Sequence, residues 1–369
     1  MPSILLLLHD VSLSGAPKSV LLVFEQLVQK GYSVTTVCLS GGGKLEARFK
    51  AISVNYYGMD SFAKKPVYDF QNRLKQKIFG EKVISEYEKV IHEISSFSYD
   101  YIYANTIVTL PFGLQMKSKV NCKMILHIHE LETVISEFFP NLLTEDIHID
   151  TYIVPSILNL KCLTDKFRIP DSKIVVIRET SDATLTIEKK KNVNSKISIL
   201  MCGGAYWRKG DDLFLLIAKN ILKSNDSIQF YWIGKQSEER RRVNQADVEK
   251  LGLEGSMFFI EETENPISWY LKSDIFMLTS REDPFPLAAI DAGMLGLPIL
   301  CFEQATGISE VIDPICVIPY LDIELMTQGI LDLINNKVLF ESISHQNVEN
   351  FKQFQPESIA KEIQTLLER

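Results

Sequence analysis

The chain has 369 residues, 46% of them hydrophobic and 23% charged, and its formal net charge at pH 7 is −8. This length exceeds the usual size of one compact domain and the composition excludes a disordered chain, so two globular domains are expected. The acidic balance excludes nucleic acid as the main partner, because backbone phosphates favour basic surfaces.

The first half of the chain alternates strand-length apolar runs with helical patterns. Ser14 or Gly15 can cap the first helix, and Pro17 suits its first turn. A long helical pattern also covers residues 68–96. Strands are predicted at Ile4–Leu8, Val34–Leu39, Val54–Tyr57, Tyr101–Ala104, Met124–Ile128, Tyr152–Val154 and Ile174–Ile177.

A polar stretch interrupts this alternation at residues 178–196. Its charge run, Glu188-Lys-Lys-Lys-Asn192, has no apolar periodicity and is interpreted as part of a linker between domains; a solvated loop inside one domain is the alternative. The alternation then resumes, with a helix at Asp211–Leu222. Further strands are predicted at Ile197–Met201, Ile228–Ile233, Met257–Ile260, Ile275–Thr279, Ile299–Phe302 and Cys316–Ile318.

This order of strands and helices predicts the α/β class, with two parallel sheets covered by helices on both faces. Ligands of such sheets bind beyond the carboxyl ends of the strands. Two sheets joined by one linker also predict a cleft between them, which is a favoured place for a substrate.

The segment Asp283-Pro-Phe-Pro-Leu287 comes directly after a predicted strand of the second sheet. Pro286 can open a helix, and the N–H groups at a helix N-terminus favour a negatively charged group. Asp283 and Asp291 stand eight positions apart and could hold hydroxyls of a sugar and of a ribose. The alternative is that Asp283 is a cap and Asp291 a solvated helix residue.

A second segment, Cys202–Gly210, also lies at the end of a strand of this sheet. Its glycines, Gly203 among them, let a ligand approach the backbone. Arg208 and Lys209 supply positive charge suited to a diphosphate. The alternative is an Arg–Lys pair on a solvated surface.

Two histidines, His127 and His129, end a strand of the first half and point to the same side of it. No further ligand comes after them at a zinc spacing, so no metal site is predicted. We expect one histidine to contact substrate, and a satisfied core histidine is the alternative for His127. The loop His9–Ala16 lacks the G-x-G-x-x-G and P-loop patterns, although Gly15 allows close approach.

The six cysteines form no CxxC pair, which is typical of buried thiols in a reducing compartment. Ile4–Leu8 is too short for a signal sequence, and no run approaches the roughly 18 apolar residues of a membrane span. We therefore expect a cytoplasmic protein, which could work at the inner face of a membrane.

Together these segments resemble the retaining nucleotide-sugar glycosyltransferases of family 4, which have the GT-B fold of two Rossmann-like domains. The resemblance covers nearly the whole chain and is strongest at about residues 198–322. The resembling segments are Ser14–Ala16, Ile128–Glu130, Gly204–Phe214, Phe230–Gly234, Ser280–Leu287 with Asp291, Cys301–Glu310 and Pro319–Asp322. The fold implies a first domain at residues 1–180, a donor domain at 181–354 and a last helix at about 355–369 that returns to the first domain.

The resemblance also implies roles for individual residues. Lys209 and Arg208 would bind the donor diphosphate, and Asp283 and His129 would contact the transferred sugar. Further donor contacts are expected at Gly15, Gly203, Ile260, Phe285, Pro286, Leu287 and Asp291, with Asp291 on the ribose and Ile260 near the base.

The implied reaction moves a sugar from a UDP-, GDP- or dTDP-sugar to a glycan or lipid-linked saccharide, with retention and without metal or cofactor. The family commonly has glutamate at both acid positions and arginine at the position of Gly204. The differences at Asp291 and Gly204 motivate one alternative, a non-catalytic relative that binds a nucleotide sugar or a partner chain. A second alternative is another enzyme class with the GT-B fold, such as a nucleotide-sugar epimerase, which needs a donor but no acceptor. A basic span at residues 64–82 could contact an anionic membrane, and a solvated helix face is the alternative.

Overall fold

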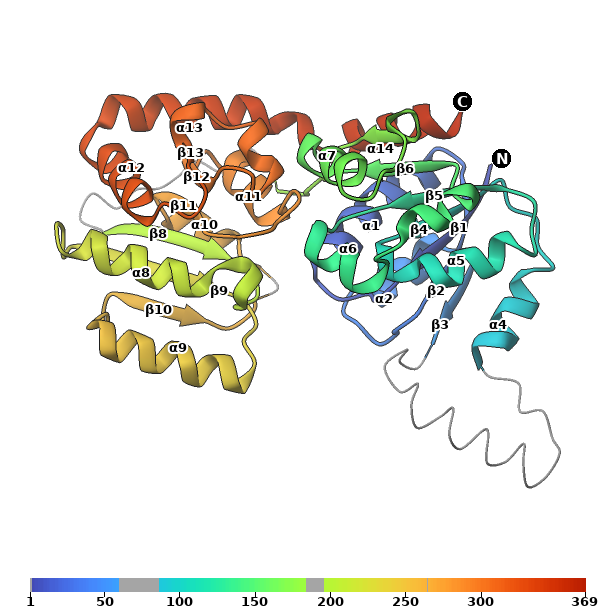
Figure 1. Ribbon diagram of the computed structural model, residues 1–369, viewed down its shortest axis with the longest axis horizontal. Coiled ribbons are helices and arrows are strands. Elements are labelled where there is room, and N and C mark those ends of the chain that lie inside the picture. Colours follow the sequence, from blue (N-terminus) through green and yellow to red (C-terminus); the bar gives the residue numbers. More distant parts are fainter. Residues whose placement is uncertain (1, 60–85, 184–195, 264) are drawn as a thin grey trace, which may run out of the picture. The chain divides into compact units, whose positions relative to one another are not determined.

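The computed structural model describes residues 2–59, 86–183, 196–263 and 265–369, which form two compact units (Figure 1). The first unit comprises Met1–Val154, Leu160–Ile177 and Ala360–Arg369, and the second comprises Pro155–Asn159 and Arg178–Ile359. The charge run of the predicted linker, the basic span at 64–82 and most of the helix predicted at 68–96 lie outside the described residues.

The sheet of the first unit has seven parallel strands in the order β3-β2-β1-β4-β5-β6-β7. Its central strands are apolar runs because helices cover both of their faces; every residue from Ile4 to Leu8 is fully buried. All seven predicted strands are confirmed, as β1 (Ser3–Leu8), β2 (Ser33–Cys38), β3 (Asn55–Gly58), β4 (Tyr101–Asn105), β5 (Lys123–His127), β6 (Thr151–Val154) and β7 (Ile174–Val176).

The first helix, α1, begins at Gly15 with Pro17 in its first turn, as predicted. Ser14 occupies the cap position in an extended conformation, but its side chain accepts no hydrogen bond from the helix. The other helices and turns along this part of the chain are α2 (Glu46–Ile52), α4 (Glu86–Ile94), η2 (Ile107–Thr109), α5 (Leu110–Lys117), α6 (Glu132–Phe138), η3 (Leu142–His148), α7 (Ile157–Asp165) and η4 (Asp171–Lys173), with α1 ending at Gln29.

The second sheet has six parallel strands in the order β10-β9-β8-β11-β12-β13. The six predicted strands are confirmed, as β8 (Ile197–Cys202), β9 (Ile228–Ile233), β10 (Met257–Ile260), β11 (Ile275–Leu278), β12 (Ile299–Phe302) and β13 (Val317–Ile318). The helices and turns of this half are η5 (Trp207–Lys209), α8 (Asp211–Leu222), α9 (Glu238–Leu251), α10 (Ile267–Lys272), α11 (Leu287–Met294), η6 (Gly307–Glu310), η7 (Pro314–Cys316), α12 (Ile323–Asn335), α13 (Lys337–Phe351), η8 (Lys352–Phe354) and α14 (Pro356–Leu367).

Each sheet has one point at which the strand order reverses. In the first sheet it lies between β1 and β4, and in the second between β8 and β11. Connections leave these two strands in opposite directions, and ligands of α/β sheets bind at such a point, beyond the carboxyl ends of the strands. The predicted segments 202–210 and 280–287 lie directly after β8 and β11. The topology therefore brings both to the reversal point of the second sheet.

The six cysteines are free, and Cys38, Cys301 and Cys316 are buried. No helix among the described residues combines the length and the apolar character that a membrane crossing requires.

Candidate functional site

The loop after β8 crosses closely over the neighbouring strand end. The Gly203 N–H donates to the Ile233 carbonyl, and the Trp232 indole N–H donates to the Gly203 carbonyl, both at 2.8 Å. A Cβ atom at Gly234, whose φ is +154°, would lie 2.1 Å from the Gly203 oxygen. Only glycine fits at residue 234, which allows the loop after β8 to lie against the end of β9.

Lys209 and Asp283, predicted as separate ligand contacts, form an ion pair with each other. The Lys209 ammonium donates to Asp283 Oδ2, and the Ser280 hydroxyl donates to the same oxygen at 3.1 Å. The two charged side chains are 13% and 7% exposed. Lys209 is therefore not part of a solvated surface pair, and Asp283 is not a helix cap. Both of these alternative interpretations are wrong. The next helix, α11, begins only at Leu287, after Pro286.

Arg208 joins the loop after β8 to the loop after β11. Its guanidinium donates to the Glu282 carbonyl at 2.8 Å and to the Tyr206 hydroxyl at 3.2 Å, and its carbonyl accepts from the Arg281 N–H at 2.8 Å. A Cβ atom at Gly204 would lie 2.7 Å from a ring carbon of Tyr206. The tyrosine ring thus fills the space beside Gly204 and holds Arg208 at the edge of the site.

Asp291 lies in α11 and is only 6% exposed, so the interpretation of it as a solvated helix residue is wrong. The Ser181 hydroxyl donates to Asp291 Oδ1. Nearby Tyr270 is fully buried, and burial together with the charges of Cys202 and Asp291 raises the pKa of its phenol. Ser181 had no motif in the sequence to identify it.

The remaining predicted contacts of the second unit surround this pair of loops. Phe285 is buried and packs edge-on against Phe354 at 5.3 Å, with the Arg178 guanidinium 5.1 Å from its ring centroid. Pro286 is the cap residue of α11, in an extended conformation. Ile260 ends β10, two strands away from β8, and its carbonyl accepts from the Gly234 N–H at 3.0 Å.

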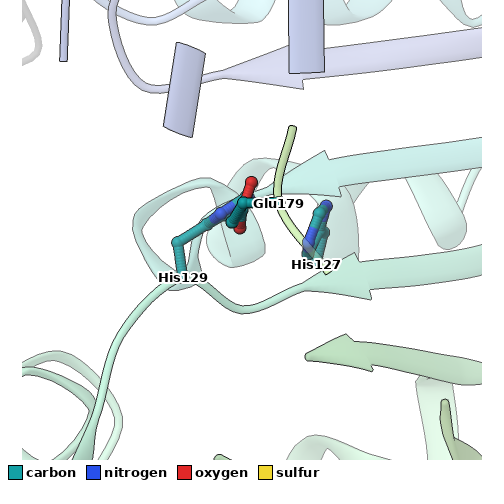
Figure 2. A group of neighbouring side chains, drawn as sticks. All are labelled: His127, His129 and Glu179. Carbon is teal, nitrogen blue, oxygen red and sulfur yellow. The ribbon is translucent and has the colours of Figure 1, made fainter. Parts of the chain in front are cut away.

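In the first unit, His127 and His129 lie ring against ring at the end of β5, with centroids 3.9 Å apart (Figure 2). His127 is buried and its Nδ1 lies 2.8 Å from the Tyr103 hydroxyl. Burial, with repulsion from His129 when that ring is protonated, holds the pKa of His127 well below the usual range. This is the core histidine that the sequence left as an alternative. His129 is half-buried, and its Nε2 lies 2.7 Å from Asn105 Oδ1.

Three further residues at the reversal point of the first sheet were not predicted. His9 comes directly after β1 and its Nδ1 lies 3.4 Å from the Thr106 hydroxyl; burial, opposed by Asp10, lowers the pKa of His9. Thr106 has φ +85° and ψ 152°, a region that almost only glycine occupies, and such strain concentrates at functional sites. Asn105 ends β4 and contacts the start of α1, where Gly15 is exposed. Their positions at strand ends could have identified His9 and Asn105.

The structure therefore brings the predicted residues together in two groups, each within one unit. Gly203, Arg208, Lys209 and Asp283 meet between β8 and β11. His129 and the start of α1 meet through Asn105 between β1 and β4.

Residues 183–354 match the family described as Glycosyl transferases group 1. An uncharacterized glycosyltransferase of Haemophilus influenzae is 29% identical over 155 residues, which cover 41% of this chain and 43% of that protein. The amylovoran biosynthesis glycosyltransferase AmsD of Erwinia amylovora is 26% identical over 170 residues, 46% of this chain and 47% of that protein. The matched residues thus span less than half the length of these curated relatives.

Solved structures resemble the whole chain. Anabaena Alr3699/HepE in complex with UDP and glucose has a TM-score of 0.79 at 16% identity, over 100% of both chains. TarM of S. aureus, in complex with Fondaparinux, alpha-GlcNAc-glycerol and UDP, has a TM-score of 0.77 at 15% identity, also over 100% of both. These likenesses show the fold, so the predicted GT-B class with two parallel α/β sheets is confirmed.

Proposed function

We propose that this protein is a glycosyltransferase that moves a sugar from a nucleoside-diphosphate sugar to an acceptor hydroxyl, with retention of the anomeric configuration. The observation that supports it most is the buried Lys209–Asp283 pair at the reversal point of the second sheet. The match of residues 183–354 to group 1 glycosyl transferases supports it independently.

The two members of this pair offer opposite chemistry to a donor. The Lys209 ammonium, with the guanidinium of Arg208, would donate to diphosphate oxygens and stabilise the charge that develops as the leaving group departs. The Asp283 carboxylate would accept from a hydroxyl of the transferred sugar. A bound donor would thus replace this ion pair. Its diphosphate would accept from Lys209, and its sugar hydroxyl would donate to Asp283.

The proposed step breaks the bond between the anomeric carbon and the diphosphate oxygen, and the acceptor oxygen bonds to that carbon on the same face. The acceptor's proton passes to the leaving diphosphate oxygen. This route requires no protein nucleophile and no metal, so the protein contributes position and electrostatic stabilisation.

Asp291 and Ile260 are proposed to bind the nucleoside, and Gly203 and the Phe285-Pro-Leu287 segment the phosphates or sugar. Asp291 would hold the ribose hydroxyls while it keeps the bond from Ser181. UDP is the first nucleotide to test, because the HepE and TarM structures contain it. GDP and dTDP are the alternatives.

His129 is proposed to contact the transferred sugar, and Gly15 the phosphates or the acceptor. A glycan or lipid-linked saccharide is the proposed acceptor. The similarity to a glycosyltransferase named for amylovoran biosynthesis supports a role in biosynthesis. We propose a cytoplasmic location. Contact with the inner face of a membrane through the span 64–82 stays a prediction, since that span lies outside the described residues.

The proposal is tested by nucleotide binding and by sugar release in the same set of variants. UDP, GDP and dTDP are screened by thermal shift, where a ligand at about 100 times its Kd stabilises the folded state by about 2.7 kcal/mol. Release of UDP from UDP-glucose is then measured with and without saccharide acceptors. Asp283→Ala should keep most nucleotide binding and lose about 100-fold or more in UDP release, and Lys209→Ala should lose both.

The matched control is Lys223→Ala, which removes an exposed lysine after α8 and should change neither quantity. Nucleotide binding with equal background release in wild type and Asp283→Ala would contradict transfer and favour a non-catalytic binding protein. A rearranged nucleotide sugar formed without acceptor would instead identify an epimerase.

A further inference from the structure

The Asn105 side chain is a fully buried amide at the reversal point of the first sheet. It ends β4, between β1 and β5, and is 0% exposed. A buried amide without partners is costly, so its contacts determine which way it can point. Asn105 makes two such contacts, with the Ala16 carbonyl at 3.3 Å and with His129 Nε2 at 2.7 Å.

The Ala16 carbonyl determines the orientation of the amide. A carbonyl oxygen can only accept a hydrogen bond, so the Asn105 atom that faces it must be the Nδ2 donor. The other terminal atom, Oδ1, then faces His129. Exchange of the two atoms would place oxygen against oxygen at Ala16.

The amide in turn determines the state of the histidine ring. Oδ1 has no hydrogen, so the bond of 2.7 Å to His129 Nε2 requires the hydrogen to lie on Nε2. In a neutral imidazole only one nitrogen carries a hydrogen, which makes Nδ1 the acceptor. The His127 ring lies 3.9 Å from the His129 ring, centroid to centroid, at an interplanar angle of 36° (Figure 2). It restricts the plane of His129, and the bond to Asn105 fixes the position of the Nε2 atom.

We propose that Asn105 is a positioning residue, which selects the Nε2–H tautomer of His129 and fixes the orientation of its ring. The backbone of α1 thereby sets the hydrogen-bonding pattern that His129 presents beside β1 and β4. The tautomer is a property of the free protein. Only the kinetic consequence of the tautomer rests on the proposed function. That consequence is the orientation of a substrate hydroxyl, on the nucleotide sugar or on the saccharide acceptor, that donates a hydrogen bond to His129.

The tautomer is measured by long-range proton–nitrogen NMR of the full chain with nitrogen-15 labelled histidine. The sequence has six histidines, so the signals of His129 can be assigned from the spectrum of His129→Gln. The wild type should show Nε2 as the protonated nitrogen and Nδ1 as the unprotonated one. A wild-type signal with Nδ1 protonated would overturn the proposal, and this outcome needs no variant to fold.

Two variants separate the tautomer effect from a structural one. Asn105→Ala removes the acceptor, so His129 should show signals of mixed tautomers. Asn105→Asp keeps an acceptor for Nε2–H and should retain the hydrogen there. His127, whose Nδ1 contacts Tyr103, is the internal control, since unchanged His127 signals indicate that the end of β5 is intact.

The kinetic readout uses UDP release from UDP-glucose. Asn105→Ala should lower kcat/KM by about 10- to 100-fold, as expected for loss of a group that orients a site histidine, and Asn105→Asp should restore part of it. An unchanged tautomer and unchanged kcat/KM in Asn105→Ala would overturn the proposal. If neither the wild type nor any variant released nucleotide, the proposed function would be wrong. The NMR measurement would still test the tautomer assignment.

Discussion

Buried ionisable side chains mark both candidate site regions, and each has a specific physical partner. Lys209 and Asp283 neutralise each other, Asp291 accepts from Ser181, and His127 is held neutral against Tyr103. A buried charge or imidazole without such a partner would cost several kcal/mol or change its protonation state. These partners come from distant parts of the sequence. Lys209, Asp283, Asp291 and His127 could be identified in advance, but the pairing of Lys209 with Asp283 and the partners Ser181 and Tyr103 could not.

The protonation of His127 predicts an acid-sensitive first unit. Its pKa in the folded protein is held well below 6.5 by burial and by repulsion from His129 when that ring is protonated, whereas an unfolded histidine has a pKa of about 6.5. Below that value the unfolded state binds a proton that the folded state does not. The free energy of unfolding should therefore fall as pH decreases from 7.5 to 5.5, by up to about 1.4 kcal/mol per unit from His127.

The measurement is urea unfolding monitored by circular dichroism at pH 7.5, 6.5 and 5.5. His127→Gln, which can keep the bond to Tyr103, should flatten the pH dependence, with a remainder from His9, whose pKa is also lowered. His345→Gln, at an exposed position, is the control. Equal slopes in wild type and His127→Gln would contradict the assignment.

At the scale of elements, the strands were predictable because parallel strands covered on both faces must be apolar throughout. The helix over Asp211–Leu222 was predicted with its observed bounds. The loops at the strand ends were less predictable. The segment 202–210 was expected to be open to a ligand, but Arg208 and Thr279 join it to the loop after β11.

Gly210 passes so close to Thr279 of the loop after β11 that a side chain at this position should have a large effect. Its φ is +72° and ψ 39°, and a Cβ atom would lie 2.1 Å from the Thr279 oxygen. Gly252, the cap of α9, has nearly the same backbone, with φ +69° and ψ 40°, but a Cβ atom there meets nothing within 4 Å. The two glycines thus share one backbone conformation, but their surroundings differ.

Gly252→Ala should therefore cost about 1 kcal/mol for the left-handed conformation alone. Gly210→Ala should cost about 1 to 3 kcal/mol more, because the loops must separate, and should weaken UDP binding. Urea unfolding monitored by tryptophan fluorescence measures both, since Trp207, Trp232 and Trp269 all belong to the second unit. Equal losses in the two variants would contradict the close approach.

At the scale of the whole molecule, both sheets repeat one topology, and each gathers polar residues where its strand order reverses. The residues proposed to bind the nucleoside, Asp291 and Ile260, and the proposed diphosphate ligands Arg208 and Lys209 belong to the second unit. A nucleotide without its sugar should therefore stabilise mainly that unit, because binding protects only the segments whose opening it opposes.

Hydrogen–deuterium exchange of the full chain with and without UDP tests this expectation. Exchange should slow at residues 203–210 and 280–291, and β1 and β2 of the first unit should be unaffected. Lys209→Ala should abolish the difference, and Lys223→Ala should keep it. Protection confined to the first unit would contradict the assignment of the nucleotide site.

The sequence by itself determined the α/β class, the thirteen described strands and most of the residues at the reversal point of the second sheet. It could do so because apolar runs, glycines and charged residues obey local rules that hold along the chain. Only the tertiary structure decided that Lys209 pairs with Asp283, that Ser181 reaches Asp291, and that the Ala16 carbonyl orients Asn105 toward His129. These contacts join residues 24 to 110 positions apart, so no local pattern could contain them.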